Sequence, residues 1–285
     1  MTGPARAQTK RPGRPGRRYP SDLDDAERAV IGPLLPGPCR RGRPLVHARR
    51  VIVDAIFNAT RAGCAWRYLP NDFPPGAPST ATSRAGATTA SWPGCTTGYA
   101  TRPGPPPAAA VIDSQPVQAA DTAPRGSRGW DNAKKNHGRK RHIAVDATGL
   151  VLAVMITAAS VQDRDAARPL LWNLSRCCTP VRLAWADAGS ADKLATCAAS
   201  LKIELEIVRK RDAHAFEVLP RRWVVERTLA WITAHRRRAR DYERLPESYE
   251  AMILWALVAL MTQHLANPRG RDHQIKHSLR RVVAP

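Results

Sequence analysis

Residues 138–160 have the sequence GRKRHIAVDATGLVLAVMITAAS, in which two apolar runs flank the tetrapeptide Asp146-Ala147-Thr148-Gly149. Runs rich in β-branched residues on either side of a short turn with Asp and Gly are typical of a β-hairpin. We therefore predict two antiparallel strands, over 138–149 and 150–160. This hairpin decides the fold class, because the segments around it must then pack on a sheet.

Segments with strand and helix character alternate around the hairpin. Strands are expected at 109–118 (AAVIDSQPVQ), 181–190 and 203–210, and helices at 163–176, 191–200, 221–238 and 248–266. Pro169 should kink the first of these helices or delay its start. Three early strands followed by strands that are linked through helices indicate the α/β class, with a mixed five-stranded sheet flanked by helices.

The first 75 residues predict a small all-α domain behind a basic arm. We assign 1–20 to the arm and expect it to be disordered, because residues 1–18 hold six Lys or Arg and no acid. Asp24 and Glu27 have the spacing of a capping box, and 47–62 has apolar positions at helical spacing before Gly63. The helical domain is assigned to 21–75, and a basic tail to 267–285.

The composition limits the class of partner. A net charge of +21 in 285 residues favours a polyanion, of which nucleic acid is the commonest. No apolar run reaches the roughly 18 residues of a membrane span, so the apolar run 252–261 is expected to be a buried helix. The start of the chain has no apolar signal-peptide core, which predicts a cytoplasmic protein. The six cysteines form no CxxC pair, which argues against a zinc site.

Three acids stand where a carboxylate is unusual. Asp113 lies inside the 109–118 strand, Asp187 lies in the 181–190 strand, and Glu226 is the one acid of the apolar and basic helix 221–238. Strands rarely contain Asp, and a divalent cation would offset the repulsion between neighbouring carboxylates. On the helix, Arg222 and Arg237 lie within about 40° of Glu226. Carboxylates for metal beside arginines for phosphate are suited to phosphoryl transfer with two metal ions.

Each acid also has a purely structural explanation. Glu226 could pair with Arg222 four residues earlier, Asp187 could be a turn residue, and Asp113 could start an Asx-turn with Ser114. Spacing alone does not decide between the explanations, because a chain with 24 acids contains many triads.

Several longer motifs together resemble a known family. They are YPSDLDDAERAVIGPLLP (19–36), GCAWRYLPNDFPP (63–75), VIDSQ (111–115), GRKRHIAVDATGLVLAV (138–154), SVQDRDAA (160–167), WADAGS (185–190), LPRRWVVERTLAW (219–231) and RRRARDYERLPES (236–248). Over about 19–75 and 109–266 the chain resembles insertion-sequence transposases of the DDE type, and the insertion-sequence-five group in particular.

The resemblance implies a ribonuclease H-like catalytic domain at 109–266, with Asp113, Asp187 and Glu226 as its catalytic, metal-binding triad. It implies an endonuclease and polynucleotidyl transferase that cuts DNA at transposon ends and joins the freed 3′-hydroxyl to target DNA, a form of DNA recombination. The implied cofactor is Mg²⁺ or Mn²⁺ as two ions, the implied partners are DNA and a second copy of the chain, and the implied location is the nucleoid. The residues expected to bind DNA are Lys134, Lys135, Arg139, Lys140, Arg141, Arg222, Arg227 and Arg237.

Residues 76–108 depart from the family pattern. In this segment 28 of 33 residues are Gly, Ala, Ser, Thr or Pro, a composition that cannot bury enough apolar surface to become ordered. We predict an irregular segment that arose from two compensating frameshifts, and loose coupling between the parts on either side. A genuine linker is the other explanation of the segment. The alternatives to an active transposase are a non-catalytic DNA-binding relic and a host ribonuclease H-like nuclease.

Overall fold

β1 (Ala109–Gln118) is the central strand of a mixed sheet in the computed structural model, which describes residues 17–35, 46–74, 106–187, 191–208 and 222–266. The sheet has six strands in the order β2-β3-β1-β5-β6, and β4 pairs with β3. β1 is antiparallel to β3 and parallel to β5, which is parallel to β6. The other strands are β2 (Gly129–Asp131), β3 (Asn136–Asp146), β4 (Val151–Ala158), β5 (Leu183–Asp187) and β6 (Glu204–Val208). The predicted mixed sheet is confirmed, and the arrangement agrees with a ribonuclease H-like domain; β2 was not predicted.

The hairpin that joins β3 and β4 is held by its own turn residues. The buried Asp146 carboxylate accepts hydrogen bonds from the Thr148 amide at 2.8 Å and the Leu150 amide at 2.9 Å. Gly149 has φ +87°, a left-handed conformation that favours glycine. The DATG sequence therefore determines a tight turn, and the predicted hairpin is confirmed.

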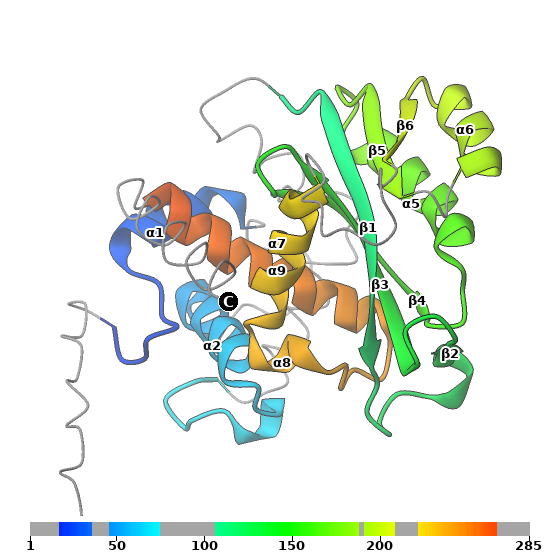
Figure 1. The fold of residues 1–285 in the computed structure, drawn as a ribbon. Helices are drawn as coiled ribbons and strands as arrows, with labels where there is room; N and C mark the ends of the chain where they lie inside the picture. The colour runs from blue at the N-terminus through cyan, green and yellow to red at the C-terminus, as the bar shows by residue number, and fades with distance from the viewer. Residues whose placement is uncertain (1–16, 36–45, 75–105, 188–190, 209–221, 267–285) are drawn as a thin grey trace, which may run out of the picture.

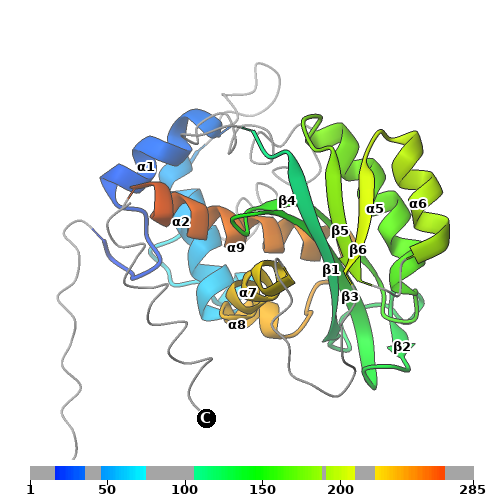
Figure 2. The same ribbon diagram turned by 45° about the horizontal axis from the view of Figure 1, so that its top comes forward.

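Helices cover both faces of the sheet (Figures 1 and 2). On one face lie α5 (Asp163–Cys177) and α6 (Ala191–Ser200), whose apolar side chains form a core with even-numbered residues of β1 such as Ala110 and Ile112. On the other face lie α7 (Arg222–Thr233) and α9 (Pro246–Ala266), which pack against Val111 and Trp185, while the short α8 (Arg236–Ala239) packs on α2 and α7. α5 begins at Asp163 and continues past Pro169, so this proline does not delay its start.

α7 and α8 replace the single helix that was predicted over 221–238. The chain leaves the helix at Ala234 and His235, where His235 has extended angles (φ −85°, ψ 117°). Beyond the break the side chains of Arg237 and Arg238 turn inward, with Arg237 Nε 2.9 Å from Glu243 Oε1 and the Arg238 guanidinium 5.1 Å from the centre of the Tyr249 ring. The prediction of one helix is wrong because tertiary contacts of these arginines outweigh the local helix propensity.

The N-terminal helices share a core with the last helix. α1 (Asp25–Ile31) starts with the predicted capping box, and α2 (Arg49–Ala62) ends at Gly63 with φ +82°. Short 3₁₀ turns lie at Gly32–Leu34, Trp66–Tyr68 and Arg125–Ser127. Ile56 and Phe57 of α2 pack against Trp255 of α9, with the Phe57 and Trp255 ring centroids 6.1 Å apart. The expectation of loose coupling between the two parts is wrong, because their apolar side chains form one cluster. Of the segment 76–108, residues 76–105 lie outside the described residues, as do the arm up to residue 16 and the tail.

α9 is the buried helix that the apolar run 252–261 predicted, and Ile253, Trp255 and Ala256 are each at most 2% exposed. Within the described part of the chain, no helix has both the length and the apolar character that crossing a bilayer requires.

Candidate active site

Asp113 lies in the middle of β1, between the partner strands β3 and β5. It is half-buried and stands opposite Ile143 of β3. Its Oδ1 atom accepts a hydrogen bond from the Ser114 amide at 2.8 Å. Pairing with β3 therefore fixes the backbone of this residue, which is a rigid base for a ligand group.

Asp187 is the last residue of β5, and the sheet brings it to Asp113. The parallel register pairs Val111 with Trp185, and the same register continued by two residues sets Asp113 beside Asp187. Because side chains alternate along a strand, both aspartates face the side on which Val111 and Trp185 are buried. Both also line one small hollow with Val111, Ile112, Trp185, Ala186 and Val208. The predicted proximity of these two acids is thus present in the structure.

Glu226 lies on α7, which packs on the same face of the sheet. Val225 and Ile232 of α7 are 0% exposed and form the packed side, whereas Glu226 is exposed. Glu226 does not line the hollow of the two aspartates. Among the residues that the structure describes, no three His, Cys, Asp or Glu side chains are grouped as metal ligands. The structure therefore brings two of the three predicted acids together and leaves the third on the neighbouring helix.

Three of the predicted DNA-binding residues are buried in β3. Arg139 is 0% exposed, Lys140 is 5% exposed and Arg141 is 1% exposed. The Lys140 Nζ atom lies 3.1 Å from Asp131 Oδ2 and 3.0 Å from Asp163 Oδ1. The prediction that these three form an exposed phosphate-binding cluster is wrong, because each cation is already satisfied by groups of this chain.

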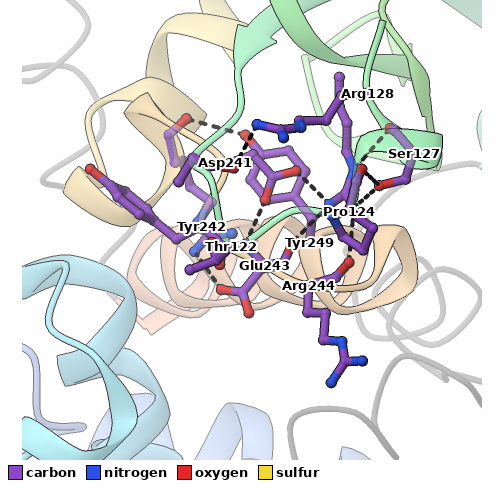
Figure 3. A network of polar contacts seen from close by, with 12 residues as sticks. Thr122, Pro124, Ser127, Arg128, Asp241, Tyr242, Glu243, Arg244 and Tyr249 are labelled. Carbon is purple, nitrogen blue, oxygen red and sulfur yellow. Dashed lines mark hydrogen bonds and ion pairs between the residues drawn. The ribbon is translucent and has the colours of Figure 1, made fainter.

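The segment between α8 and α9, with Asp241, Glu243 and Arg244, lies in a network of polar contacts that also includes Ser127 (Figure 3). Arg139 joins β3 to this segment. Its Nη1 atom lies 2.8 Å from Asp241 Oδ2 and 2.9 Å from the Glu243 carbonyl, and its Nη2 atom lies 3.0 Å from the Arg244 carbonyl. Ser127 accepts two more hydrogen bonds, at its hydroxyl and its carbonyl. The network fixes the chain that follows α7 against the sheet.

Arg237 and Arg227 also make structural contacts. Arg237 donates to the Cys64 carbonyl and lies over the Trp66 ring at 5.5 Å, so it joins α8 to the N-terminal helices. It is 6% exposed, which does not fit the predicted DNA contact. The half-buried Arg227 lies 2.7 Å from the Thr148 carbonyl and is stacked on Trp223 and Trp231.

Lys134 and Lys135 remain predicted DNA contacts, because both are exposed in the turn between β2 and β3. The Lys134 Nζ atom lies 3.3 Å from the carbonyl of Ser114, the residue after Asp113. This turn therefore reaches the strand that carries the first acid. The side chain of Arg222 lies outside the described residues.

α7 is attached to the sheet at residues that were not predicted. The Thr228 hydroxyl donates to the Gly149 carbonyl at 2.8 Å, and Arg141 Nη2 donates to the Thr233 hydroxyl at 2.9 Å. Gln115, two residues after Asp113, accepts from Arg141 Nε at 2.9 Å. The sequence does not indicate these attachments, because it does not show which group the hydroxyl of a helical Thr will contact.

Comparisons with known proteins agree with this architecture. Residues 104–261 match the family described as "Transposase DDE domain", and residues 23–89 match "Putative transposase of IS4/5 family". Neither match covers residues 90–103. A protein of Burkholderia cepacia, described as "Putative transposase for insertion sequence element IS402", is 30% identical over 151 residues, which are 50% of this chain and 69% of that protein.

Proposed function

The chain belongs to the DDE transposases of the IS4/5 type, and on this premise we propose that it cuts DNA at the ends of an insertion sequence and joins the freed ends to target DNA. The observation that carries the proposal is the pair Asp113 and Asp187, which face one hollow from neighbouring parallel strands. Glu226, on the helix over the same face, is the proposed third carboxylate.

The two aspartates suit a Mg²⁺ or Mn²⁺ ion. Mg²⁺ is commonly held by one or two carboxylates and completes its coordination with water and phosphate oxygens. Asp113 and Asp187 offer two carboxylates from neighbouring strands, and Asp187 is exposed. Two ions bound there would activate the attacking group and balance the charge that develops on the phosphate.

The proposed reaction has two steps, and neither forms a covalent bond to the protein. In the first, the oxygen of water attacks the phosphorus, the bond to the 3′-oxygen breaks, and that oxygen receives a proton. In the second, the freed 3′-hydroxyl attacks a phosphodiester of target DNA, so one bond forms as one breaks. Asp113, Asp187 and Glu226 position the reacting groups, while Lys134 and Lys135 hold the DNA backbone.

Two further parts of the proposal concern assembly and an alternative. Both ends of an element must be cut together, so we propose a homodimer on DNA.

A non-catalytic DNA-binding relic is the second candidate function. It is favoured by the unusual composition of 76–108, of which residues 90–103 lie outside both family matches, and by the lining of the hollow, which includes Asp113 and Asp187 but not Glu226.

The test is a cleavage assay on a plasmid that carries the DNA flanking this gene. We expect cleavage with Mg²⁺ and none with EDTA. Asp113→Asn and Asp187→Asn should abolish cleavage and leave DNA binding intact, whereas Asp165→Asn on the exposed face of α5 should cleave normally. Cleavage that survives either active-site substitution would disprove the assignment. DNA binding without cleavage in the wild type would support the relic.

A further inference from the structure

Arg141 forms a bridge between the strand of Asp113 and the helix of Glu226. It is 1% exposed, and its Nε atom lies 2.9 Å from Gln115 Oε1 on β1. Its Nη2 atom lies 2.9 Å from Thr233 Oγ1 on α7, and its Nη1 atom lies 3.3 Å from the Arg238 carbonyl on α8. One guanidinium therefore contacts β1, α7 and α8.

Both ends of the bridge stand in fixed relation to a proposed catalytic acid. Gln115 is two residues after Asp113 on β1, so their side chains leave the same face of the strand. Thr233 is seven residues after Glu226 on α7. At about 100° per residue this separation brings the two side chains to within about 20° of each other around the helix, two turns apart. The bridge thus spans the same two elements, along the same faces, as the acids.

We propose that Arg141 is a positioning residue, which sets the placement of Glu226 relative to Asp113 by holding α7 against β1. This inference rests on the proposed function, since it gives Arg141 its role through the third carboxylate. The planar fork of arginine can donate to Gln115 and Thr233 together, which the single ammonium of lysine cannot do in the same geometry. Arg227 and Thr228 also attach α7, through the Thr148 and Gly149 carbonyls. These contacts and the bridge all follow Glu226 along the helix.

Arg139 provides a matched control. It lies two residues earlier on β3, on the same face of the sheet, and is 0% exposed. Its side chain forms hydrogen bonds with Ser127, Asp241, Glu243 and Arg244, none of which lies on β1 or α7. Substitution of either buried arginine should lower the stability of the fold by a similar amount. Only substitution of Arg141 should also change the placement of Glu226 relative to Asp113.

The experiment measures Mn²⁺ binding to the full chain by isothermal titration calorimetry. We expect Arg141→Lys to weaken Mn²⁺ binding about tenfold, the size typical of groups that orient metal ligands, and Arg139→Lys to leave it within about twofold. Thr233→Val removes the hydroxyl that accepts from Arg141 and donates to the Leu229 carbonyl of its own helix, and it should act in the same direction as Arg141→Lys. Thr233→Ser keeps the hydroxyl and should bind as the wild type does.

The same titration in a Glu226→Gln background separates positioning from general disturbance. If Arg141 acts through Glu226, Arg141→Lys should cause no further loss in that background. Additive losses, or equal Mn²⁺ binding by Thr233→Val and Thr233→Ser, would overturn the inference and leave the proposed function standing. Binding that Asp113→Asn, Asp187→Asn and Glu226→Gln all leave unchanged would instead overturn the proposed metal site, and this inference with it.

Discussion

The buried ion pair between Arg139 and Asp241 leads to a quantitative prediction. Both side chains are 0% exposed, and Nη1 lies 2.8 Å from Oδ2. Arg139→Met would leave the carboxylate without its cation and the Glu243 and Arg244 carbonyls without a donor. Removal of one partner from a buried pair costs about 3–5 kcal/mol. We therefore expect Arg139→Met to lower the free energy of unfolding by about that amount near neutral pH.

The predicted loss depends on pH in a definite direction. Burial raises the pKa of the Asp241 carboxyl, and the Glu243 amide and Arg139 oppose that rise. Without Arg139 the folded-state pKa of Asp241 rises further above its unfolded value. A group with a raised pKa stabilises the folded state at low pH, and that contribution is lost as the pH rises. The loss of stability in Arg139→Met should consequently be smaller at pH 5 than at pH 8.

Urea unfolding followed by tryptophan fluorescence at both pH values is the assay. Asp121→Asn is the control, since it removes an ion pair of 3.3 Å in which Asp121 is fully exposed, and it should cost less than about 1 kcal/mol. Arg139→Met combined with Asp241→Leu should recover part of the loss, because the buried carboxylate is removed together with its cation, while the Glu243 and Arg244 carbonyls still lack their donor. A loss below about 1 kcal/mol at pH 8, or one that is equal at both pH values, would refute the reasoning.

Three other changes have expected outcomes. Trp255→Ala should lower the free energy of unfolding by about 3–5 kcal/mol, because Trp255 is 2% exposed in the core that α9 shares with α2. Trypsin should then cleave faster within 46–74, and unchanged proteolysis would contradict the shared core. Gly149→Ala should lower the free energy of unfolding in urea by about 1–3 kcal/mol, because φ is +87° and the new Cβ would lie 2.8 Å from the Thr228 hydroxyl. Gly32→Ala is the control and should cost less, because the space around Gly32 is open. Alanine at Lys134 and Lys135 should weaken binding of all DNA sequences alike and reduce the salt slope by about 2 in titrations of labelled duplexes; a loss for one sequence alone would indicate base contacts instead.

Much of the fold could be predicted from the sequence where local signals suffice. The capping box at Asp24, the turn at Gly149 and the acid-bearing strand around Asp113 each depend on residues close in the chain, and each is present. The pairing of Asp113 with Asp187 was also predictable, because carboxylates are costly in neighbouring strands unless they share a role.

The features that were not predicted depend on contacts between residues that are far apart in the sequence. Arg139, Lys140 and Arg141 looked like an exposed basic run, but Arg139 pairs with Asp241, 102 residues later. No local pattern distinguishes an arginine that binds phosphate from one that binds a buried carboxylate. The break after Thr233 was missed for the same reason, since the arginines beyond it turn toward acceptors on other elements.

α9 has a consequence for the order of events during synthesis. One side of this helix, with Tyr249, Ile253 and Leu257, belongs to the core under the sheet, and the other, with Trp255 and Val258, belongs to the core of α1 and α2. Both cores are therefore open until the last described element has left the ribosome. Contacts between the earliest helices and the latest one close a loop of most of the chain, so we expect this assembly to be a late step of folding. A chain that stops before residue 246 has neither core complete and exposes apolar surface from both, which makes it a substrate for proteases and aggregation.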